Sequence, residues 1–321
     1  MKKDNNNSRI LGLHHVTALS SDAQKNVDFY AGILGMRMVK KTVNFDAPDV
    51  YHLYYGDYMG SPGTLMTFFP YRGMARGRKG SSQLTVTSFS IPEGSADYWM
   101  KRLDKSGVVR ANHMKRFDEE FIYAEDDDGL GIELVVCRDD KREGYTNGHI
   151  PEQYAIRGFY GITLNERHFE RTEGFLTGLL DHKLVQEEDR RRRYSPANGP
   201  GTYVDVVVDG SDIGRQGSGT VHHVAFATHD DASQLQVRER LSDEGVHVTP
   251  VIDRQYFHSI YFREPGGVLF EVATLPPGMD IDEDPARLGE SLKLAPWHES
   301  KREQIEENLE PVTLDTGKFR D

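Results

Sequence analysis

The chain has 321 residues and only one cysteine, Cys137, so it cannot form an intramolecular disulfide. Such scarcity of cysteine is typical of a protein that works in a reducing compartment. No stretch approaches the roughly 18 uninterrupted apolar residues of a membrane-spanning helix. The polar N-terminal segment is not followed by the apolar core of a secretory signal. We therefore expect a cytoplasmic protein without a membrane segment.

Basic residues are also in short supply. The 39 lysines and arginines are outnumbered by 51 aspartates and glutamates, which gives a formal net charge of -12. A surface with this balance repels a phosphate backbone, so we expect no nucleic-acid partner. Two local basic runs, 72–79 and 190–193, are exceptions, and solvated loops are the simplest interpretation of both. The hydrophobic content of 37% is enough for a substantial core.

The chain contains an internal repeat that is marked by histidine pairs. His14-His15 and His222-His223 stand in near-identical apolar frames, Gly-Leu-His-His-Val-Thr and Thr-Val-His-His-Val-Ala. After the first pair, the Ser21-Asp-Ala-Gln pattern predicts a helix start with a capping box, and three strand-like runs follow the helix.

The same order of elements recurs from residues 84, 158 and 220, so the sequence predicts four β-α-β-β-β units and an α+β fold. We expect an N-terminal domain of two units over 8–150 and a C-terminal domain of two units over 155–285. The charged segment 286–321 is expected to wrap the surface as a tail, partly helical around 299–308.

Metal-ligating residue types occur at equivalent positions in only some of the units. The first strands align His15, Thr85, Tyr160 and His223, and the last strands align Glu271 with Phe68, Glu133 and a residue near Val206. Two histidines and one carboxylate are the ligands of a mononuclear iron(II) site with open coordination positions. The sequence thus predicts one site, which requires the first unit to pack against the fourth and leaves the other two units to form a metal-free cup.

Histidines on strands are more often packed or surface residues than ligands. By default we expect the other histidines to lie at the surface or to support a site without binding the metal: His52, His113, His149, His168, His182, His229, His247 and His298. The predicted triad differs because its two histidines recur at equivalent positions. In addition, Glu271 lies between Phe270 and Val272, and a buried carboxylate needs a partner or a metal.

Four β-α-β-β-β units resemble the vicinal oxygen chelate superfamily, in which paired units form a cup-shaped barrel around a metal. The chain is similar in particular to bacterial hydroquinone and catechol ring-cleaving dioxygenases. The similarity extends from Leu13-His-His-Val-Thr to about Leu288-Gly289. It includes Tyr51-His-Leu-Tyr-Tyr-Gly-Asp, Gly60-Ser-Pro-Gly-Thr-Leu-Met-Thr, Gly77-Arg-Lys-Gly-Ser and Pro265-Gly-Gly-Val-Leu-Phe-Glu.

This resemblance implies that His15, His223 and Glu271 bind iron(II), and manganese(II) accepts the same ligand set. It also implies supporting roles for His14, Thr17, His222, Arg254 and Tyr261. Arginine can stabilise a phenolate or superoxide-like anion, tyrosine can hydrogen-bond oxygen or substrate, and histidine can move protons. Without the resemblance, a surface salt bridge for Arg254 and a packed strand aromatic for Tyr261 are equally good interpretations.

The expected substrate contacts are Thr17, His258 and Phe68. A glyoxalase-I-type isomerase on the same fold needs a fourth protein ligand, commonly a carboxylate, and Phe68 stands at the position expected for it. An apolar residue there favours an oxygenase, because it leaves one face of the metal free and suits an aromatic ring.

The predicted function is an iron(II)-dependent, extradiol-type ring-cleaving dioxygenase that acts on a hydroquinone or catechol with dioxygen. A metal-dependent isomerase or thiol transferase on the same fold is an alternative. A second alternative is a non-catalytic protein that binds an aromatic ligand. The sequence leaves open the ring substituents and the oligomeric state, a homo-oligomer included.

Overall fold

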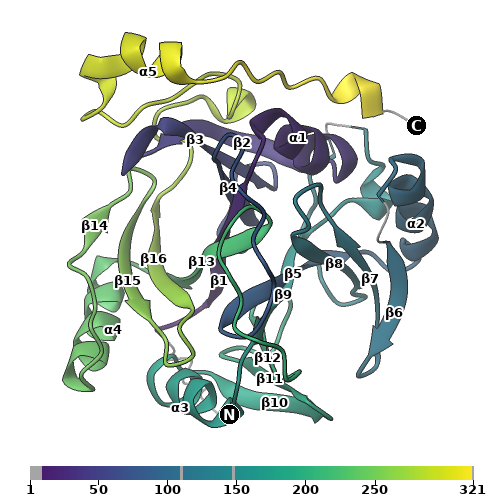
Figure 1. Ribbon diagram of the computed structural model, residues 1–321, viewed down its shortest axis with the longest axis vertical. Coiled ribbons are helices and arrows are strands. Elements are labelled where there is room, and N and C mark those ends of the chain that lie inside the picture. The colour runs from purple at the N-terminus through teal and green to yellow at the C-terminus, as the bar shows by residue number, and fades with distance from the viewer. Residues whose placement is uncertain (1–8, 109–110, 147–148, 320–321) are drawn as a thin grey trace, which may run out of the picture.

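The computed structural model describes residues 9–108, 111–146 and 149–319. The outermost boundaries expected from the sequence, residues 8 and 321, lie outside these ranges. All four expected β-α-β-β-β units are present, so the predicted α+β fold is confirmed (Figure 1). In the described part of the chain, no helix is long and apolar enough to cross a membrane.

The elements follow the chain unit by unit. Unit 1 contains β1 (Gly12–Ser20), α1 (Ala23–Val27) with a π-helical extension (Asp28–Ile33), β2 (Arg37–Asn44), β3 (Ala47–Gly56) and β4 (Leu65–Pro70). Unit 2 contains β5 (Gln83–Ile91), α2 (Ala96–Lys105), β6 (Asn112–Arg116), β7 (Glu119–Glu125) and β8 (Gly131–Val136). Unit 3 contains β9 (Gly158–Asn165), α3 (Phe169–Leu179), β10 (Lys183–Glu188), β11 (Arg191–Ser195) and β12 (Tyr203–Val207). Unit 4 contains β13 (Thr220–Thr228), α4 (Asp231–Asp243), β14 (Ile252–Asp253), β15 (Phe257–Arg263) and β16 (Leu269–Pro277).

Helix α1 begins one residue later than its capping pattern predicts. Asp22 is the N-cap, and its side chain accepts a hydrogen bond from the Lys25 amide at 2.9 Å. The Ser21 hydroxyl instead donates to Asp128 Oδ1 at 2.6 Å, in the turn between β7 and β8. A contact between units therefore overrides the local preference for serine at the cap.

The strands form two eight-stranded sheets. Sheet 1 has the order β14-β15-β16-β13-β1-β4-β3-β2, and sheet 2 has the order β10-β11-β12-β9-β5-β8-β7-β6. Units 1 and 4 meet through the antiparallel pair β1–β13, as predicted, and units 2 and 3 meet through β5–β9. Each sheet takes one unit from each of the expected domains 8–150 and 155–285. These ranges divide the sequence, but neither of them contains a complete sheet.

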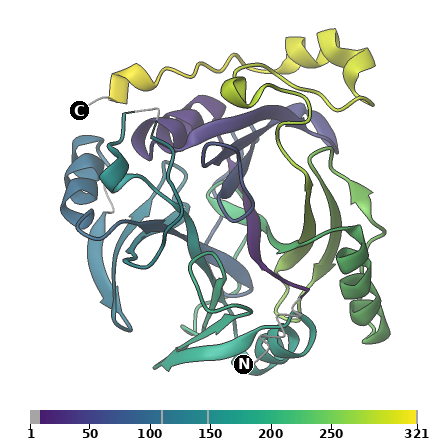
Figure 2. The same ribbon diagram turned by 180° about the vertical axis from the view of Figure 1, so that it is seen from behind.

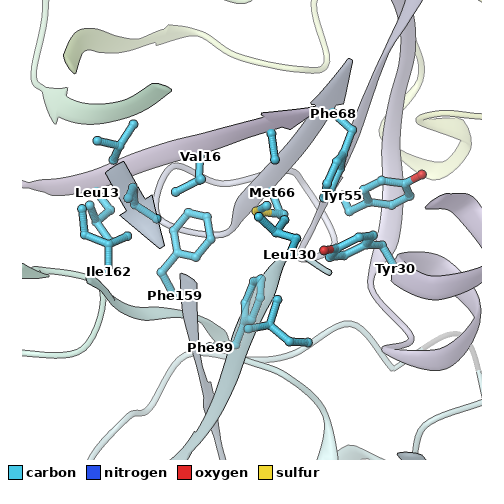
Figure 3. Close-up of a cluster of buried hydrophobic side chains, with 14 of the residues drawn as sticks. Leu13, Val16, Tyr30, Tyr55, Met66, Phe68, Phe89, Leu130, Phe159 and Ile162 are labelled. Carbon is cyan, nitrogen blue, oxygen red and sulfur yellow. The ribbon is translucent and has the colours of Figure 1, made fainter. Parts of the chain in front are cut away.

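The two sheets share one apolar core (Figure 3). Leu13, Val16 and Met66 of sheet 1 lie in the same buried cluster as Phe89 and Phe159 of sheet 2. Since side chains alternate along a strand, the residues between these core positions face away from the shared core and line the concave side of each sheet.

The C-terminal tail crosses the outer side of unit 1 (Figures 1 and 2). It contains short helices at Pro285–Arg287, Glu299–Lys301 and Thr316–Phe319, and α5 (Arg302–Asn308), so the expected helix near 299–308 is confirmed. Leu294, Ile305 and Leu309 of the tail bury Val43 of β2. The fully buried Lys40 ammonium pairs with Asp282 and Glu283 at 2.6 Å each. Apolar contacts thus hold the tail against unit 1, and buried charge holds the segment that leads into it.

Sheet 2 repeats the geometry of sheet 1 with different side chains. In the parallel strand pairs, Glu133 lies opposite Ser88 and Asp205 opposite Thr163, as Glu271 lies opposite Ala225 in sheet 1. The positions equivalent to His15 and His223 are then Val86 and Gly161. Each lies one residue after the position that the sequence alignment predicted, Thr85 or Tyr160. Two carboxylates therefore remain at the ligand positions of sheet 2, but no histidine accompanies them.

Arginine side chains neutralise these two buried carboxylates. Arg116 donates to both oxygens of Glu133 at 2.5 and 2.6 Å, and Arg193 donates to both oxygens of Asp205 at 2.6 and 3.0 Å. Bidentate guanidinium pairs supply the positive charge that a metal would otherwise supply. The described residues contain no second cluster of three metal-ligating groups besides that of sheet 1.

Replacing Arg193 with Leu should lower the free energy of unfolding by about 3–5 kcal/mol, because the buried Asp205 would keep only Arg191 as a hydrogen-bonded partner among the described residues and Glu119 would also lose its hydrogen-bonded arginine. Urea denaturation followed by circular dichroism measures this loss. Arg192→Leu is the matched control. Its partners Glu173 and Glu187 are partly exposed, so the expected cost is about 1 kcal/mol or less. Equal losses in the two variants would contradict the structural role assigned to Arg193.

Candidate metal centre

The central strand pair of sheet 1 brings the two histidine motifs together. Strands β1 and β13 run antiparallel, with His15 opposite Ala225 and Thr17 opposite His223, so a local twofold axis relates the motifs. The pairing is interrupted at His14 on one strand and at His222 on the other. Irregularities of this kind re-aim side chains near functional sites. Here the two imidazole rings of each pair come within hydrogen-bonding distance of each other.

Glu271 of β16 completes a compact triad. The His15 and His223 Nε2 atoms are 3.2 Å apart, and Glu271 Oε2 lies 3.3 Å from the first and 3.1 Å from the second. In an octahedral site, adjacent metal–ligand bonds meet at right angles. If each bond is about 2.1 Å long, two adjacent ligand atoms lie about 3.0 Å apart. The three atoms are therefore spaced as three adjacent ligands of an octahedral ion.

Burial supports the same conclusion. All three residues are buried, and Glu271 Oε2 has no hydrogen-bond donor among the residues that the structure describes. Burial by itself raises the pKa of Glu271, but His15 and His223 outweigh this effect and hold the pKa well below the ordinary carboxyl value. A buried, ionised oxygen without a donor fits a cation at this point.

Neighbouring groups orient the ligand atoms. The Ser259 hydroxyl donates to Glu271 Oε1 and leaves Oε2 directed at the histidines. His14 Nε2 lies 3.2 Å from the Thr274 carbonyl oxygen, which can only accept, so Nε2 carries the proton. His14 Nδ1 must then accept from His15 Nδ1, 2.9 Å away, and the lone pair of His15 Nε2 is free for a metal.

His222 has the equivalent contact in unit 4, with its Nδ1 atom 2.8 Å from His223 Nδ1. Burial, followed by the neighbouring His223, lowers the pKa of His222 to about 4. Burial and the neighbouring His15 likewise lower the pKa of His14 to about 3. Both partner histidines are therefore neutral, as the hydrogen-bonding scheme requires.

A cavity of about 480 Å³ opens in front of the triad. Five of the expected site residues line it: His15, His222, His223, Arg254 and Tyr261. Its walls are largely aromatic and aliphatic, with Phe45, Phe69, Ile252, Phe257 and Leu269 among them. The structure therefore combines a polar floor, which holds the candidate metal ligands, with largely apolar walls.

Arg254 and Tyr261 act as one polar group on the unit 4 side of this cavity. Arg254 Nε donates to the Tyr261 hydroxyl at 3.0 Å, and its Nη1 donates to Asp46 Oδ2 at 3.0 Å. Asp46 lies at the tip of the β2–β3 hairpin, whose neighbouring Phe45 packs against Trp297 of the tail with ring centroids 5.4 Å apart. The rim of the cavity is therefore built from units 1 and 4, and the tail packs against Phe45 of this rim.

The structure corrects the expected role of Phe68. In the parallel pairing of β1 with β4, Thr17 lies opposite Thr67 and Ala18 opposite Phe68. Thr67, rather than Phe68, is thus the unit 1 equivalent of Glu271. Phe68 is fully buried in the shared core, and its ring centroid lies 4.4 Å from that of Tyr30 (Figure 3).

Two other expected substrate contacts do not reach the cavity. Thr17 is fully buried, and its hydroxyl lies 2.7 Å from that of Thr67. His258 lies on the other face of β15 from Tyr261, where its Nδ1 atom contacts Asp231 Oδ1 at 2.6 Å. The alternation of side chains along β15 accounts for this placement.

Sequence reasoning missed His52, Tyr54, Phe257 and Ser259, which line the cavity or hold the triad. His52 has no histidine at the equivalent position of another unit, so the repeat could not single it out. Alternation along the run from 51 to 56 was the available signal, since it predicts that His52 and Tyr54 share a face.

The sequence pattern of the Glyoxalase/Bleomycin resistance protein/Dioxygenase superfamily matches residues 12–134 and 160–272. The chain belongs to this superfamily. The two matched ranges correspond to units 1 and 2 and to units 3 and 4, so the expected resemblance to the vicinal oxygen chelate fold is confirmed.

Relatives within the superfamily are similar over almost the whole chain. The Bacillus subtilis (strain 168) protein named "Putative ring-cleaving dioxygenase MhqO" is 41% identical over 306 residues, which cover 95% of this chain and 98% of that protein. The "Chlorohydroquinone/hydroquinone 1,2-dioxygenase" of Sphingobium indicum is 34% identical over 318 residues, which cover 95% and 98%. Glyoxalase I from Zea mays shares the fold at 15% identity, with a TM-score of 0.61 over 82% of this chain and 92% of that one.

Replacing His15, His223 or Glu271 singly with Ala should remove most of the bound metal, because two ligands hold an ion far less tightly than three. Inductively coupled plasma mass spectrometry of purified protein measures the occupancy. A chelator should lower the melting temperature of the parent protein, since bound metal stabilises the folded state by mass action, and should have little effect on the variants. His258→Ala, outside the cavity, is the control, and full occupancy in all three triad variants would place the ion elsewhere.

Proposed function

We propose that this protein is an iron(II)-dependent, extradiol-type ring-cleaving dioxygenase whose substrates are a hydroquinone or catechol and dioxygen. Manganese(II) fits the same ligand set. The observation that carries the proposal is that, within the described ranges, the chain supplies three adjacent ligand atoms and no fourth. The names of the relatives, which include a chlorohydroquinone/hydroquinone dioxygenase, support the same class of substrate.

The position of a fourth protein ligand supports an oxygenase over an isomerase. Thr67 stands in unit 1 where Glu271 stands in unit 4, and its hydroxyl is engaged by the side chains of Thr17 and His52 at 2.7 and 2.9 Å. Thr67 therefore supplies no carboxylate ligand, and its hydroxyl is already hydrogen-bonded to other side chains. Open coordination positions thus remain for a substrate oxygen and for dioxygen.

The cavity supports an aromatic substrate. Its volume of about 480 Å³ exceeds the roughly 150 Å³ of an engineered apolar cavity that binds benzene. Phe69, Phe257 and Leu269 provide apolar surface around the triad, and apolar walls also limit the access of water to a reactive centre.

His15, His223 and Glu271 would hold iron(II), which would supply open coordination positions and redox chemistry for the reaction of a diphenol with dioxygen. The residues of the chain hold and orient the substrate. Arg254 has the charge to stabilise an ionised phenol oxygen, and the Tyr261 hydroxyl, 3.0 Å from Arg254 Nε, is directed by the same group. His222 lines the cavity and is neutral, and with its Nδ1 atom accepting from His223 its Nε2–H group can donate a hydrogen bond to a substrate oxygen.

Anaerobic loading with iron(II), followed by addition of a diphenol and then oxygen, tests the proposal directly. We expect oxygen uptake with at least one hydroquinone or catechol from a small panel, together with loss of the aromatic absorbance. Protein without metal is the control and should consume no oxygen. Absence of uptake with every diphenol, combined with isomerisation of a hemithioacetal, would replace the dioxygenase with the isomerase. Binding of the diphenols without turnover of either kind would indicate a ligand-binding protein.

Thr67→Glu should add a carboxylate at the open side of the ion, retain bound metal and suppress oxygen uptake. The physical reason is that a fourth protein ligand competes with substrate and dioxygen for coordination positions. Thr67→Val, which removes the hydroxyl without adding a carboxylate, separates this effect from loss of the hydrogen bonds to Thr17 and His52. Equal oxygen uptake in the Thr67→Glu variant and the parent, at full metal content, would refute the open-face argument.

A further inference from the structure

The twofold relation between units 1 and 4 extends beyond the metal ligands to two tyrosines. Tyr261 lies opposite Glu271 in the pairing of β15 with β16, and Tyr54 lies opposite Thr67 in the pairing of β3 with β4. Because Thr67 is the equivalent of Glu271, Tyr54 is the equivalent of Tyr261. Both tyrosines line the cavity, one from each of the units that form the cup.

The two tyrosines have partners of different charge. The Tyr261 hydroxyl accepts from the Arg254 guanidinium, which is always charged. The Tyr54 hydroxyl lies 2.9 Å from His52 Nδ1, and His52 Nε2 lies 2.9 Å from the Thr67 hydroxyl. Burial is the largest cause that lowers the pKa of His52 well below its ordinary value. The unit 1 side of the cavity therefore offers a neutral hydrogen-bonding chain, whereas the unit 4 side offers a cation.

In the described part of the protein, the side chains of His52 and Thr67 each have two hydrogen-bonding contacts, whereas the Tyr54 hydroxyl has only the contact with His52. His52 uses both ring nitrogens, and Thr67 contacts both His52 and Thr17. If Tyr54 donates to His52, its lone pairs can accept from a ligand. If His52 donates to Tyr54, the phenolic proton can be donated to a ligand. In either direction the Tyr54 hydroxyl has one hydrogen bond left for a molecule in the cavity.

We propose, on the basis of the dioxygenase function above, that Tyr54 binds the substrate hydroxyl that keeps its proton, while the Arg254–Tyr261 side receives the oxygen that ionises. A diphenol presents both kinds of oxygen when one hydroxyl loses its proton. A charged donor favours the ionised oxygen, and a neutral hydroxyl that can donate or accept suits the protonated one. His52 and Thr67 are positioning residues, since they act on the substrate only through the Tyr54 hydroxyl.

The inference is tested by binding rather than turnover. Iron(II)-loaded protein under nitrogen is titrated with hydroquinone, with catechol and with phenol, which has only one hydroxyl. Tyr54→Phe should weaken binding of at least one diphenol about fivefold to tenfold, the size expected for one neutral hydrogen bond, and should change phenol binding less than twofold. Tyr55→Phe is the matched control. It removes a hydroxyl that contacts Asn26 in the core, away from the cavity, and should leave all three affinities at the parent values.

The positioning role of His52 has its own readout. His52→Leu leaves the Tyr54 hydroxyl without its partner and should reproduce part of the loss of diphenol affinity. His52→Gln, whose amide can still hydrogen-bond Tyr54, should restore affinity toward the parent value. Rescue by Gln but not by Leu distinguishes hydrogen bonding from simple filling of space.

The remaining outcomes separate the inference from the proposed function. Equal weakening of phenol and both diphenols by Tyr54→Phe would overturn the inference, because it would indicate a change in packing. Parent-like diphenol binding by Tyr54→Phe, in a protein whose parent consumes oxygen with diphenols, would overturn the inference and leave the function standing. A parent protein that binds no diphenol would overturn both.

Discussion

A carboxylate buried in sheet 1 without a donor on one oxygen is the constraint around which the site is arranged. Glu271 is fully buried, its Oε1 atom is held by Ser259, and its Oε2 atom faces only the two histidine nitrogens. A buried negative charge is costly unless a cation or donors compensate for it. One cation bound to Glu271 Oε2 would compensate for this charge. The histidine tautomers and the hydrogen bonds that fix them are consistent with such an ion, as is the presence of Thr67 in place of a second carboxylate.

Sheet 2 meets the same physical problem in another way. It retains Glu133 and Asp205 at the positions of the ligand carboxylate, but Arg116 and Arg193 neutralise them through fixed side chains. A guanidinium is always charged and has no coordination position to offer. Sheet 1 therefore has ligand atoms available for an ion, whereas the corresponding carboxylates of sheet 2 are already paired with arginine side chains.

The sequence was sufficient to predict the four units, their pairing and the triad, because His15 and His223 recur in matching frames and Glu271 ends the last unit. It was not sufficient to tell Phe68 from Thr67. Which of two adjacent residues faces the metal depends on the register of β1 against β4, and a slip of one residue turns every side chain to the other face. His52 and Tyr54 were missed for a related reason, since their importance comes from contacts with Thr67 and not from any repeated pattern.

The pairing of the first unit with the last also fixes an order of assembly during synthesis. Strand β1 leaves the ribosome early, but β13 and β16, which complete its sheet and its ligand set, come from unit 4 at the far end of the repeat array. At about 5–20 residues per second, roughly ten seconds or more of translation separate the two histidine motifs. Units 2 and 3 are contiguous in the chain and can form their sheet in this interval. The full ligand set for the ion can therefore assemble only after Glu271 of unit 4 has been made.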